Sequence, residues 1–175
     1  NPRKLDMNLV MAQQARRIID RLVGWCSERP ELVDAGVLVV DGLGNVNDLG
    51  DYLHVGVDNP FGSGQVAAAS SDQNWAGATP SIRREDEGSV TCTVVSNNPD
   101  GNQKAARDRV FMVAGVVQQM LREYIRLDPP GFEPINGLIK TSFGGLEYDQ
   151  DNDQEGALAV LVFRIGFQMN LSETE

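Results

Sequence analysis

The longest regular pattern of apolar and polar positions lies near the C-terminus, over residues 157–171. Every odd position there is apolar, which is the period of a β-strand with one face in a core: Ala159, Leu161, Phe163, Ile165, Phe167, Met169 and Leu171. The even positions change halfway, from apolar Leu158, Val160 and Val162 to Arg164, Gly166, Gln168 and Asn170. We therefore predict that the first half of the second strand face also needs cover, and that a partner surface supplies it.

Apolar spacings of three and four predict two long helices. The first is expected to begin after an Asp6 cap and to run to about Glu28, where Pro30 stops it. Its apolar stripe comprises Met11, Ala15, Ile18, Ile19, Leu22, Trp25 and Cys26. The second, at about 100–127, is expected to begin at the capping-box-like pair Asp100 and Gln103 and to end at a Pro-Pro-Gly run. Its apolar face comprises Ala106, Val110, Val113, Ala114, Val117, Met120, Leu121 and Tyr124.

Three strand candidates lie between these helices, at residues 35–40, 52–57 and 89–96, and two more strands follow the second helix. The predicted order is therefore α-β-β-β-α-β-β. We expect one α+β domain over residues 1–175, with two helices packed on one face of a mainly antiparallel sheet of four to five strands. Residues 59–88 contain no convincing element and are expected to be a long loop, whose Trp75 packs against something in an assembly.

Composition narrows the classes of partner. The chain has 175 residues, with 15 Lys and Arg against 25 Asp and Glu, a formal net charge of −10. Binding that neutralises phosphates draws its affinity from Lys and Arg, so a nucleic acid is not an expected ligand. No apolar run of membrane-spanning length and no signal-peptide pattern is present, so we expect a soluble protein with no membrane partner.

The residue types that carry chemistry are few. Cys26 and Cys92 have apolar neighbours and no metal-type spacing, so both are expected to be buried small hydrophobes. A triad of Cys92, His54 and Asp58 can be drawn, but no elbow-type turn surrounds the cysteine. No phosphate-binding glycine motif is present. We therefore expect no enzymatic activity, no cofactor and no metal site.

The last two strands are expected to meet at an acidic turn, residues 147–156. Its alternating aspartates are the type of ligand that calcium prefers. However, Gln154 stands where an EF-hand loop needs glycine, and Val160 where it needs a bidentate glutamate. We instead predict a hairpin tip that serves electrostatics and docking through four carboxylates: Asp149, Asp151, Asp153 and Glu155.

The second half of the chain resembles the tail-terminator proteins of long-tailed bacteriophages. The resemblance covers about residues 83–171, in the segment RREDEGSVTCTV at 83–94, Asp100-Gly101, the helix AARDRVF at 105–111 and a hairpin ending in GALAVLVFRI at 156–165. It rests on order and spacing, and the family has no fixed site motif. It implies a small α+β fold and a hexameric ring that sits on the last ring of the tail tube, arrests tube growth and docks the head-side connector.

The resemblance also implies a place and partners: the top of the virion tail, after assembly in the host cytoplasm, with the genome passing through the ring. An acidic ring repels phosphates, so DNA is expected to pass without specific binding. We assign the subunit contact to Val160 and Val162, and further interface positions to the four carboxylates of the acidic turn and to Trp75.

Two other classes of function stay open at this point. A neighbouring head–tail connector or tail-completion protein would also be acidic, oligomeric and without catalytic residues, and stoichiometry and the bound end of the tail would separate it. A monomeric α+β domain that binds a small molecule or has enzymatic activity would instead need a pocket.

Overall fold

A computed structural model describes residues 2–43, 50–57, 69–76, 83–153 and 156–172, with side chains over 14–43, 50–57, 69–70, 87–152 and 156–170. Its elements, in chain order, are α1 (Pro2–Glu28), α2 (Pro30–Asp34), β1 (Leu38–Asp41), β2 (Asp51–Val55), β3 (Ala69–Ala76), β4 (Arg83–Asn98), α3 (Gln103–Glu123), β5 (Leu138–Asp153) and β6 (Gly156–Ser172).

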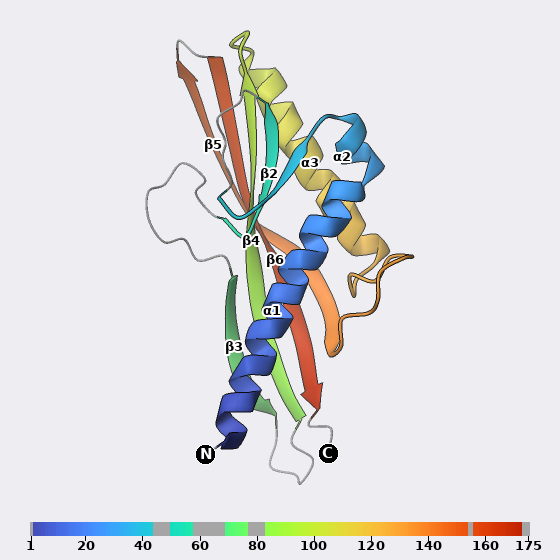
Figure 1. Cartoon of the computed structure of the whole chain (residues 1–175). Coiled ribbons are helices and arrows are strands. Elements are labelled where there is room, and N and C mark those ends of the chain that lie inside the picture. Colours follow the sequence, from blue (N-terminus) through green and yellow to red (C-terminus); the bar gives the residue numbers. More distant parts are fainter. Residues whose placement is uncertain (1, 44–49, 58–68, 77–82, 154–155, 173–175) are drawn as a thin grey trace.

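The strands form one sheet in the order β1-β2-β4-β6-β5, and β3 pairs with the first part of β4. β1 and β2 are parallel, and every other pairing is antiparallel. β4, β6 and β5 are 16, 17 and 16 residues long and run beside one another through most of the molecule (Figure 1). Strands of about five or six residues are the norm, so this long three-stranded ribbon dominates the shape.

The two long helices, α1 and α3, cover the same face of this sheet (Figure 1). Directly opposite residues share a face of a sheet, so the register Leu53–Val94–Leu161 marks the face that the helices cover. The predicted odd positions of β6 are buried there, from Ala159 to Met169, whereas the side chain of Leu171 lies outside the described part. All of the predicted α3 stripe up to Leu121 is buried as well. The α+β class and the burial of both patterns are confirmed.

The order of elements differs from the prediction, because α2 and β3 were not expected. Pro30 ends α1 but also starts α2 at its first turn, where a proline costs no hydrogen bond. The predicted helix starts were wrong too. α1 begins at Pro2 instead of after Asp6, and the cap of α3 is Asn102, whose side-chain oxygen accepts a hydrogen bond from Ala105 N at 3.0 Å.

The prediction of a loop over residues 59–88 was wrong in part. β3 occupies Ala69–Ala76 and β4 begins at Arg83; residues 58–68 and 77–82 lie outside the described part. The first part of β4 is charged at successive positions, so no alternating apolar pattern marks it. It is a strand because it pairs on one side with β3 and on the other with β6. Pairing with two neighbouring strands satisfies the backbone hydrogen bonds of this segment, although its sequence pattern does not predict a strand.

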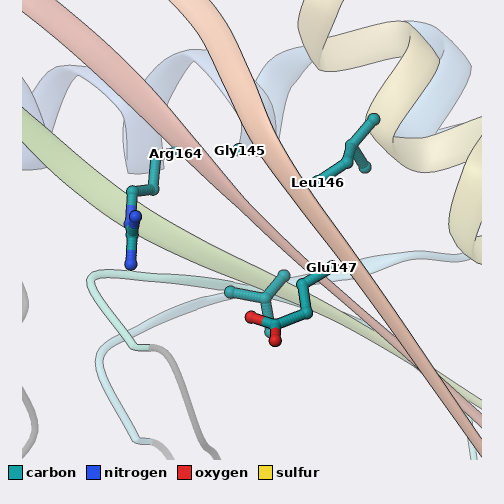
Figure 2. A pocket seen from close by; sticks show the side chains of 5 residues that line it. Gly145, Leu146, Glu147 and Arg164 are labelled. Carbon is teal, nitrogen blue, oxygen red and sulfur yellow. The ribbon is translucent and has the colours of Figure 1, made fainter.

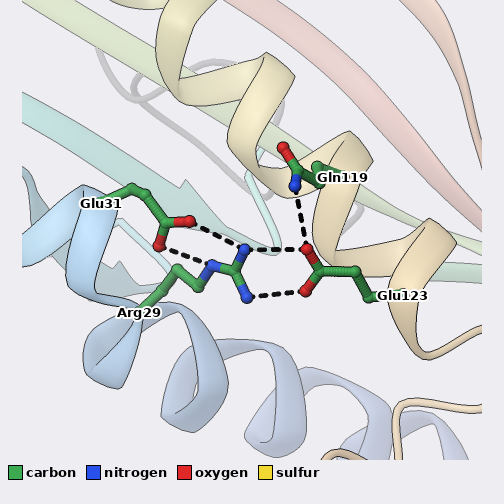
Figure 3. A network of polar contacts seen from close by, with 4 residues as sticks. All are labelled: Arg29, Glu31, Gln119 and Glu123. Atoms are coloured by element: carbon green, nitrogen blue, oxygen red, sulfur yellow. Dashed lines mark hydrogen bonds and ion pairs between the residues drawn. The ribbon is translucent and has the colours of Figure 1, made fainter.

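An arginine holds α3 against the junction of α1 and α2 (Figure 3). Arg29 lies between Glu31 and Glu123, with Nε 2.8 Å from Glu31 Oε2 and Nη1 2.8 Å from Glu123 Oε2. Gln119 also donates to Glu123, at 2.9 Å. The hydrogen bond from Arg29 lowers the pKa of Glu123. Because Glu123 is near the C-terminal end of α3, this network fixes that end of the helix against α1 and α2.

A second arginine holds the other half of α3. Arg109 donates to Asp51 Oδ2 from Nε at 2.8 Å and from Nη2 at 2.6 Å, and it also donates to the carbonyl of Ala35. Ser96 donates to the other oxygen of Asp51. These bonds tie α3 to the start of β2, to β4 and to the segment after α2. Arg109 therefore orients α3 relative to the sheet, whereas Arg29 orients it relative to α1 and α2.

Candidate interface on the second face of the sheet

An apolar stripe crosses the second face of the sheet, the face opposite to α1 and α3. The register places Val160 level with Val95 and Tyr52, and Val162 level with Thr93 and His54. The four residues on β2 and β4 are buried, whereas Leu158, Val160 and Val162 on β6 are half-buried. The stripe is therefore open to solvent toward β5.

An acidic row borders the open end of the stripe. Its members are Glu147, Asp149 and Asp151 on β5, all exposed, which stand opposite Val162, Val160 and Leu158. Successive side chains of a strand alternate between faces, so these alternate carboxylates all lie on the second face. The last two strands do meet within 147–156, as predicted, and pair up to Asp153 and Gly156. The predicted length of the turn was wrong, because β5 extends to Asp153 and β6 begins at Gly156. The same spacing that mimics a calcium loop is the spacing of an acidic row on a strand.

A bulge in β5 shapes the surface beside the acidic row. The pairing with β6 shifts between Gly144 and Glu147. A shallow hollow forms there, lined by Gly145, Leu146, Glu147, Val162 and Arg164. In Figure 2, Glu147 and Arg164 extend to one side of the sheet, whereas Leu146 extends to the other. Ligand sites are enclosed and mostly apolar, so this open hollow is better suited to contact with a protein surface.

The structure separates the residues of the drawn triad. Cys92 stands opposite Val55 and Phe163, on the face that the helices cover, whereas His54 lies on the second face. Burial raises the pKa of the Cys92 thiol to about 12, and it raises the pKa of Cys26 further still. Asp58 lies outside the described residues. Cys92 and His54 therefore cannot act as a nucleophile and base pair, because the sheet stands between them.

The described part of the chain contains neither a metal-binding cluster nor a membrane-spanning helix. No three His, Cys, Asp or Glu side chains are grouped there in a way that could hold a metal ion. None of the described helices has the length and hydropathy to cross a membrane. No family model matches the sequence.

The structure brings together four of the seven predicted interface residues. Val160, Val162, Asp149 and Asp151 are neighbours on the second face. Asp153 is the last residue of β5 but its side chain is not described, and Glu155 lies outside the described residues. Trp75 is in β3 opposite Arg84, at the other end of the sheet from the acidic row, and its side chain is not described either. Sequence reasoning did not find Leu146 or Phe111, which are 55% and 45% exposed. In the sequence, the Gly144-Gly145 pair directly before Leu146 is the feature that could have indicated a bulge in β5.

His54 is the one polar residue of the stripe that can titrate near neutral pH. It is fully buried, and its Nδ1 lies 3.0 Å from the carbonyl oxygen of Gly42. A carbonyl only accepts, so Nδ1 carries the proton and donates, which leaves Nε2 as an acceptor. Nε2 has no hydrogen-bond partner within the described part. Burial lowers the pKa of His54 below its ordinary value, because charging the ring would require solvation that the site does not give.

This environment predicts acid sensitivity. The unfolded chain takes up the His54 proton at about pH 6.5, and the folded chain takes it up only at lower pH. The contribution of the neutral His54 ring to the free energy of unfolding is therefore fully present above pH 6.5. It decreases as the pH drops below 6.5, by at most about 1.4 kcal/mol per pH unit for one proton. Urea unfolding of the wild type and of His54→Gln between pH 7.5 and 5 measures this. His54 is the only histidine, so the variant should show a flatter profile. Equal slopes for both proteins would contradict the buried neutral ring.

Proposed function

We propose that this chain is a structural protein of a phage virion that forms a ring, caps the tail tube, stops its polymerisation and offers a docking surface to the head-side connector. One observation carries the proposal: the second face of the sheet holds an apolar stripe, ending in half-buried Val160 and Val162, beside an exposed acidic row. Such a surface suits contact with another protein subunit. The resemblance over residues 83–171 supplies the kind of assembly.

The charge of the chain suits a ring at the top of a tail. A net charge of −10 and an exposed row of carboxylates repel DNA phosphates, so a genome can pass through the ring without specific binding. The partners are then copies of the same chain in a ring of six, the tube protein and the connector. The ring assembles in the host cytoplasm and stays in the virion, with no membrane contact.

A neighbouring role in the same assembly is the second candidate. The acidic row and the half-exposed stripe would equally suit a head–tail connector or a tail-completion protein. The two roles differ in the end of the tail that is bound and in the number of copies. A monomeric domain that binds a ligand or is an enzyme has less support, because the hollow beside β5 is shallow and Cys92 and His54 lie on opposite faces.

The experiment is a tube-capping assay. Tail tubes are grown from purified tube protein with and without this chain, and imaged by negative stain. We expect short tubes, each with a ring at one end, and native mass spectrometry should give six copies per ring. Tubes that elongate equally with and without the protein, and that carry no ring, would overturn the proposed function. Rings bound only to the head-side connector would favour the second candidate.

Neutralising the acidic residues is expected to weaken docking but not folding. The variant carries Asp149→Asn, Asp151→Asn, Asp153→Asn and Glu155→Gln. Exposed charges contribute little to stability, so the free energy of unfolding should change by less than about 0.5 kcal/mol. Association with tube or connector should weaken roughly three- to tenfold at low salt and show little difference at high salt, because salt screens charge steering.

A matched control neutralises four exposed carboxylates elsewhere, by Glu28→Gln, Glu87→Gln, Asp100→Asn and Glu133→Gln. This control should bind like the wild type. Calorimetry with calcium completes the test. A stoichiometric calcium signal that the variant with Asp149, Asp151, Asp153 and Glu155 neutralised loses, together with unchanged docking, would reject electrostatic docking and indicate an ion site instead.

A further inference from the structure

The outer edge of β5 is only partly covered. The sheet order places β5 at one end of the path, and within the described part it pairs with β6 alone (Figure 1). The start of this edge is covered, because Thr141 donates to the carbonyl of Ile125 from its main-chain N at 2.8 Å and from its hydroxyl at 2.9 Å. Beyond the bulge, residues 147–151 make no main-chain hydrogen bond to any described segment other than β6. We call residues 147–151 the open edge.

The register shows which main-chain groups point away from the sheet at the open edge. Asn170 N donates to the carbonyl of Gly137, directly before β5, at 2.8 Å. The even residues of β6 therefore direct their main-chain groups toward β5, because these groups alternate in direction along a strand. Tyr148 and Gln150 stand opposite odd residues of β6. Their N–H and C=O groups therefore point to the open side and can pair with another strand.

On the helix side of the sheet, apolar side chains border the open edge. Leu146 and Phe111 are 55% and 45% exposed, and the ring centroid of Phe111 lies 5.5 Å from that of Tyr148. Arg107, one turn before Phe111 on α3, is exposed as well. A strand added on this side would therefore gain by placing apolar side chains here, and a basic side chain would lie near a like charge.

On the other side of the sheet, the open edge carries the acidic row of Glu147, Asp149 and Asp151. Directly opposite residues of neighbouring strands share a face. A strand beside β5 would therefore place every second side chain next to a carboxylate and the others next to the apolar border. The two sides of the open edge together specify a strand in which basic and apolar residues alternate.

We propose that the open edge binds an extended segment of a different protein, in which Lys or Arg alternates with apolar side chains. The segment adds a strand to the sheet through the main-chain groups of Tyr148 and Gln150. Its basic side chains lie next to the acidic row, and its apolar side chains pack against Leu146 and Phe111. One subunit carries the whole open edge, so this binding does not depend on the proposed ring.

A second copy of this chain does not fit the open edge. Among the 15 Lys and Arg residues of the sequence, only Arg107 and Arg109 stand two positions apart, and both lie in α3. Arg109 is already bound to Asp51. A net charge of −10 also makes a copy repel the acidic row. The fitting occupant is therefore another protein.

Protection of an exposed strand from unwanted pairing is the simpler explanation of the carboxylates and the bulge. It accounts for the acidic row, which keeps acidic chains apart. It does not account for exposed Phe111 and Leu146, because protection of an edge removes apolar surface. Strand addition by a basic segment explains both sides, since the acidic row then excludes acidic strands and selects a basic one.

A labelled synthetic peptide in which lysine alternates with valine is the probe. Fluorescence anisotropy measures its binding to the whole chain at low salt. We expect the wild type to bind it, and to bind at least roughly tenfold more weakly a peptide of the same composition with its lysines in one block and its valines in another. The variant with Phe111→Ser and Leu146→Ser should lose binding to a similar extent.

A matched control carries Val33→Ser and Leu38→Ser. These side chains are 56% and 59% exposed and belong to α2 and β1, so the control should bind the alternating peptide like the wild type. Circular dichroism verifies that each variant is folded.

Hydrogen exchange tests the main-chain contact. With the alternating peptide bound, the amide protons of Tyr148 and Gln150 should exchange at least roughly tenfold more slowly, whereas those of Asp149 and Asp151, which face β6, should change little. Gln150→Pro removes an outward N–H without removing a bond to β6. Gln150→Ala is its control, because it keeps the N–H. Only the proline variant should lose peptide binding.

Three results would each overturn strand addition: equal binding of the alternating and block peptides, unchanged exchange at Tyr148 and Gln150, or an equal loss of binding in the control with Val33→Ser and Leu38→Ser. If Gln150→Pro does not fold, exchange in the wild type decides. The tube-capping assay is separate. Capped tubes without peptide binding would reject the open-edge contact alone, and peptide binding without capping would reject the proposed function alone.

Discussion

Replacing Phe163 or Leu161 by aspartate is expected to unfold the chain, whereas Val160→Asp or Val162→Asp should leave a folded subunit that assembles poorly. Phe163 and Leu161 are fully buried, and Phe163 stacks on Phe143 with ring centroids 4.8 Å apart. A buried carboxylate without a partner, together with the lost apolar contacts, costs more than about 4 kcal/mol. Domains of this size are stable by about 5–15 kcal/mol, so such a loss removes most of the folded population.

Val160 and Val162 differ because they reach solvent. Both are half-buried on the second face, where a carboxylate keeps part of its hydration. The added charge lies opposite Asp149 or Glu147, and repulsion between exposed charges is worth about 1 kcal/mol or less. Circular dichroism and gel filtration of the four variants, with and without tube, measure the difference. If both pairs of variants behave alike, the assignment of the two faces of β6 is wrong.

Gly88→Ala is expected to destabilise the chain by about 3 kcal/mol or more. A β-carbon at this position of β4 would lie 2.4 Å from Phe167 Cζ and 2.5 Å from the carbonyl oxygen of Ser70. The Phe167 ring is packed in the core and has little room to move. The Ser70 carbonyl is part of the β3 backbone, so β3 and β4 would have to move apart. Urea denaturation measures the free energy of unfolding.

Gly115→Ala is the matched control for that substitution. Gly115 is exposed in α3, and a β-carbon there meets no atom within 4 Å. Alanine should stabilise the helix by about 0.5–1 kcal/mol, because it reduces the freedom of the unfolded chain. If Gly88→Ala is as stable as the wild type, the close approach of β3 and β6 across β4 is wrong.

The periodic part of this fold could be predicted from the sequence. The alternation in β6 and the three–four spacing in α3 each identified the buried face, residue by residue, from Ala159 to Met169 and from Ala106 to Leu121. Backbone geometry alone sets these periods, so a local pattern is enough to reveal them. The class of fold and the burial of both cysteines followed from the same patterns.

The candidate site was predictable only in part. Val160 and Val162 were identified because apolar side chains on the more solvent-exposed face of a strand are expected to be buried by a partner surface. The aspartates were recognised as a cluster but placed in a turn, because alternate carboxylates look alike in a calcium loop and on a strand. Their true position depends on how far β5 pairs with β6, and pairing length is a property of two segments together.

The remaining features depend on which segments become neighbours. β3 and the charged start of β4 are strands because each finds a partner, and neither has an apolar alternation of its own. The two edges of the sheet exist because β1 and β5 end up outermost in an order that differs from chain order. The exposure of Leu38, Phe111 and Leu146 follows from that order. A side chain stays exposed only where no other segment packs over it. Which segments become neighbours is decided by the tertiary structure and cannot be predicted from the local sequence.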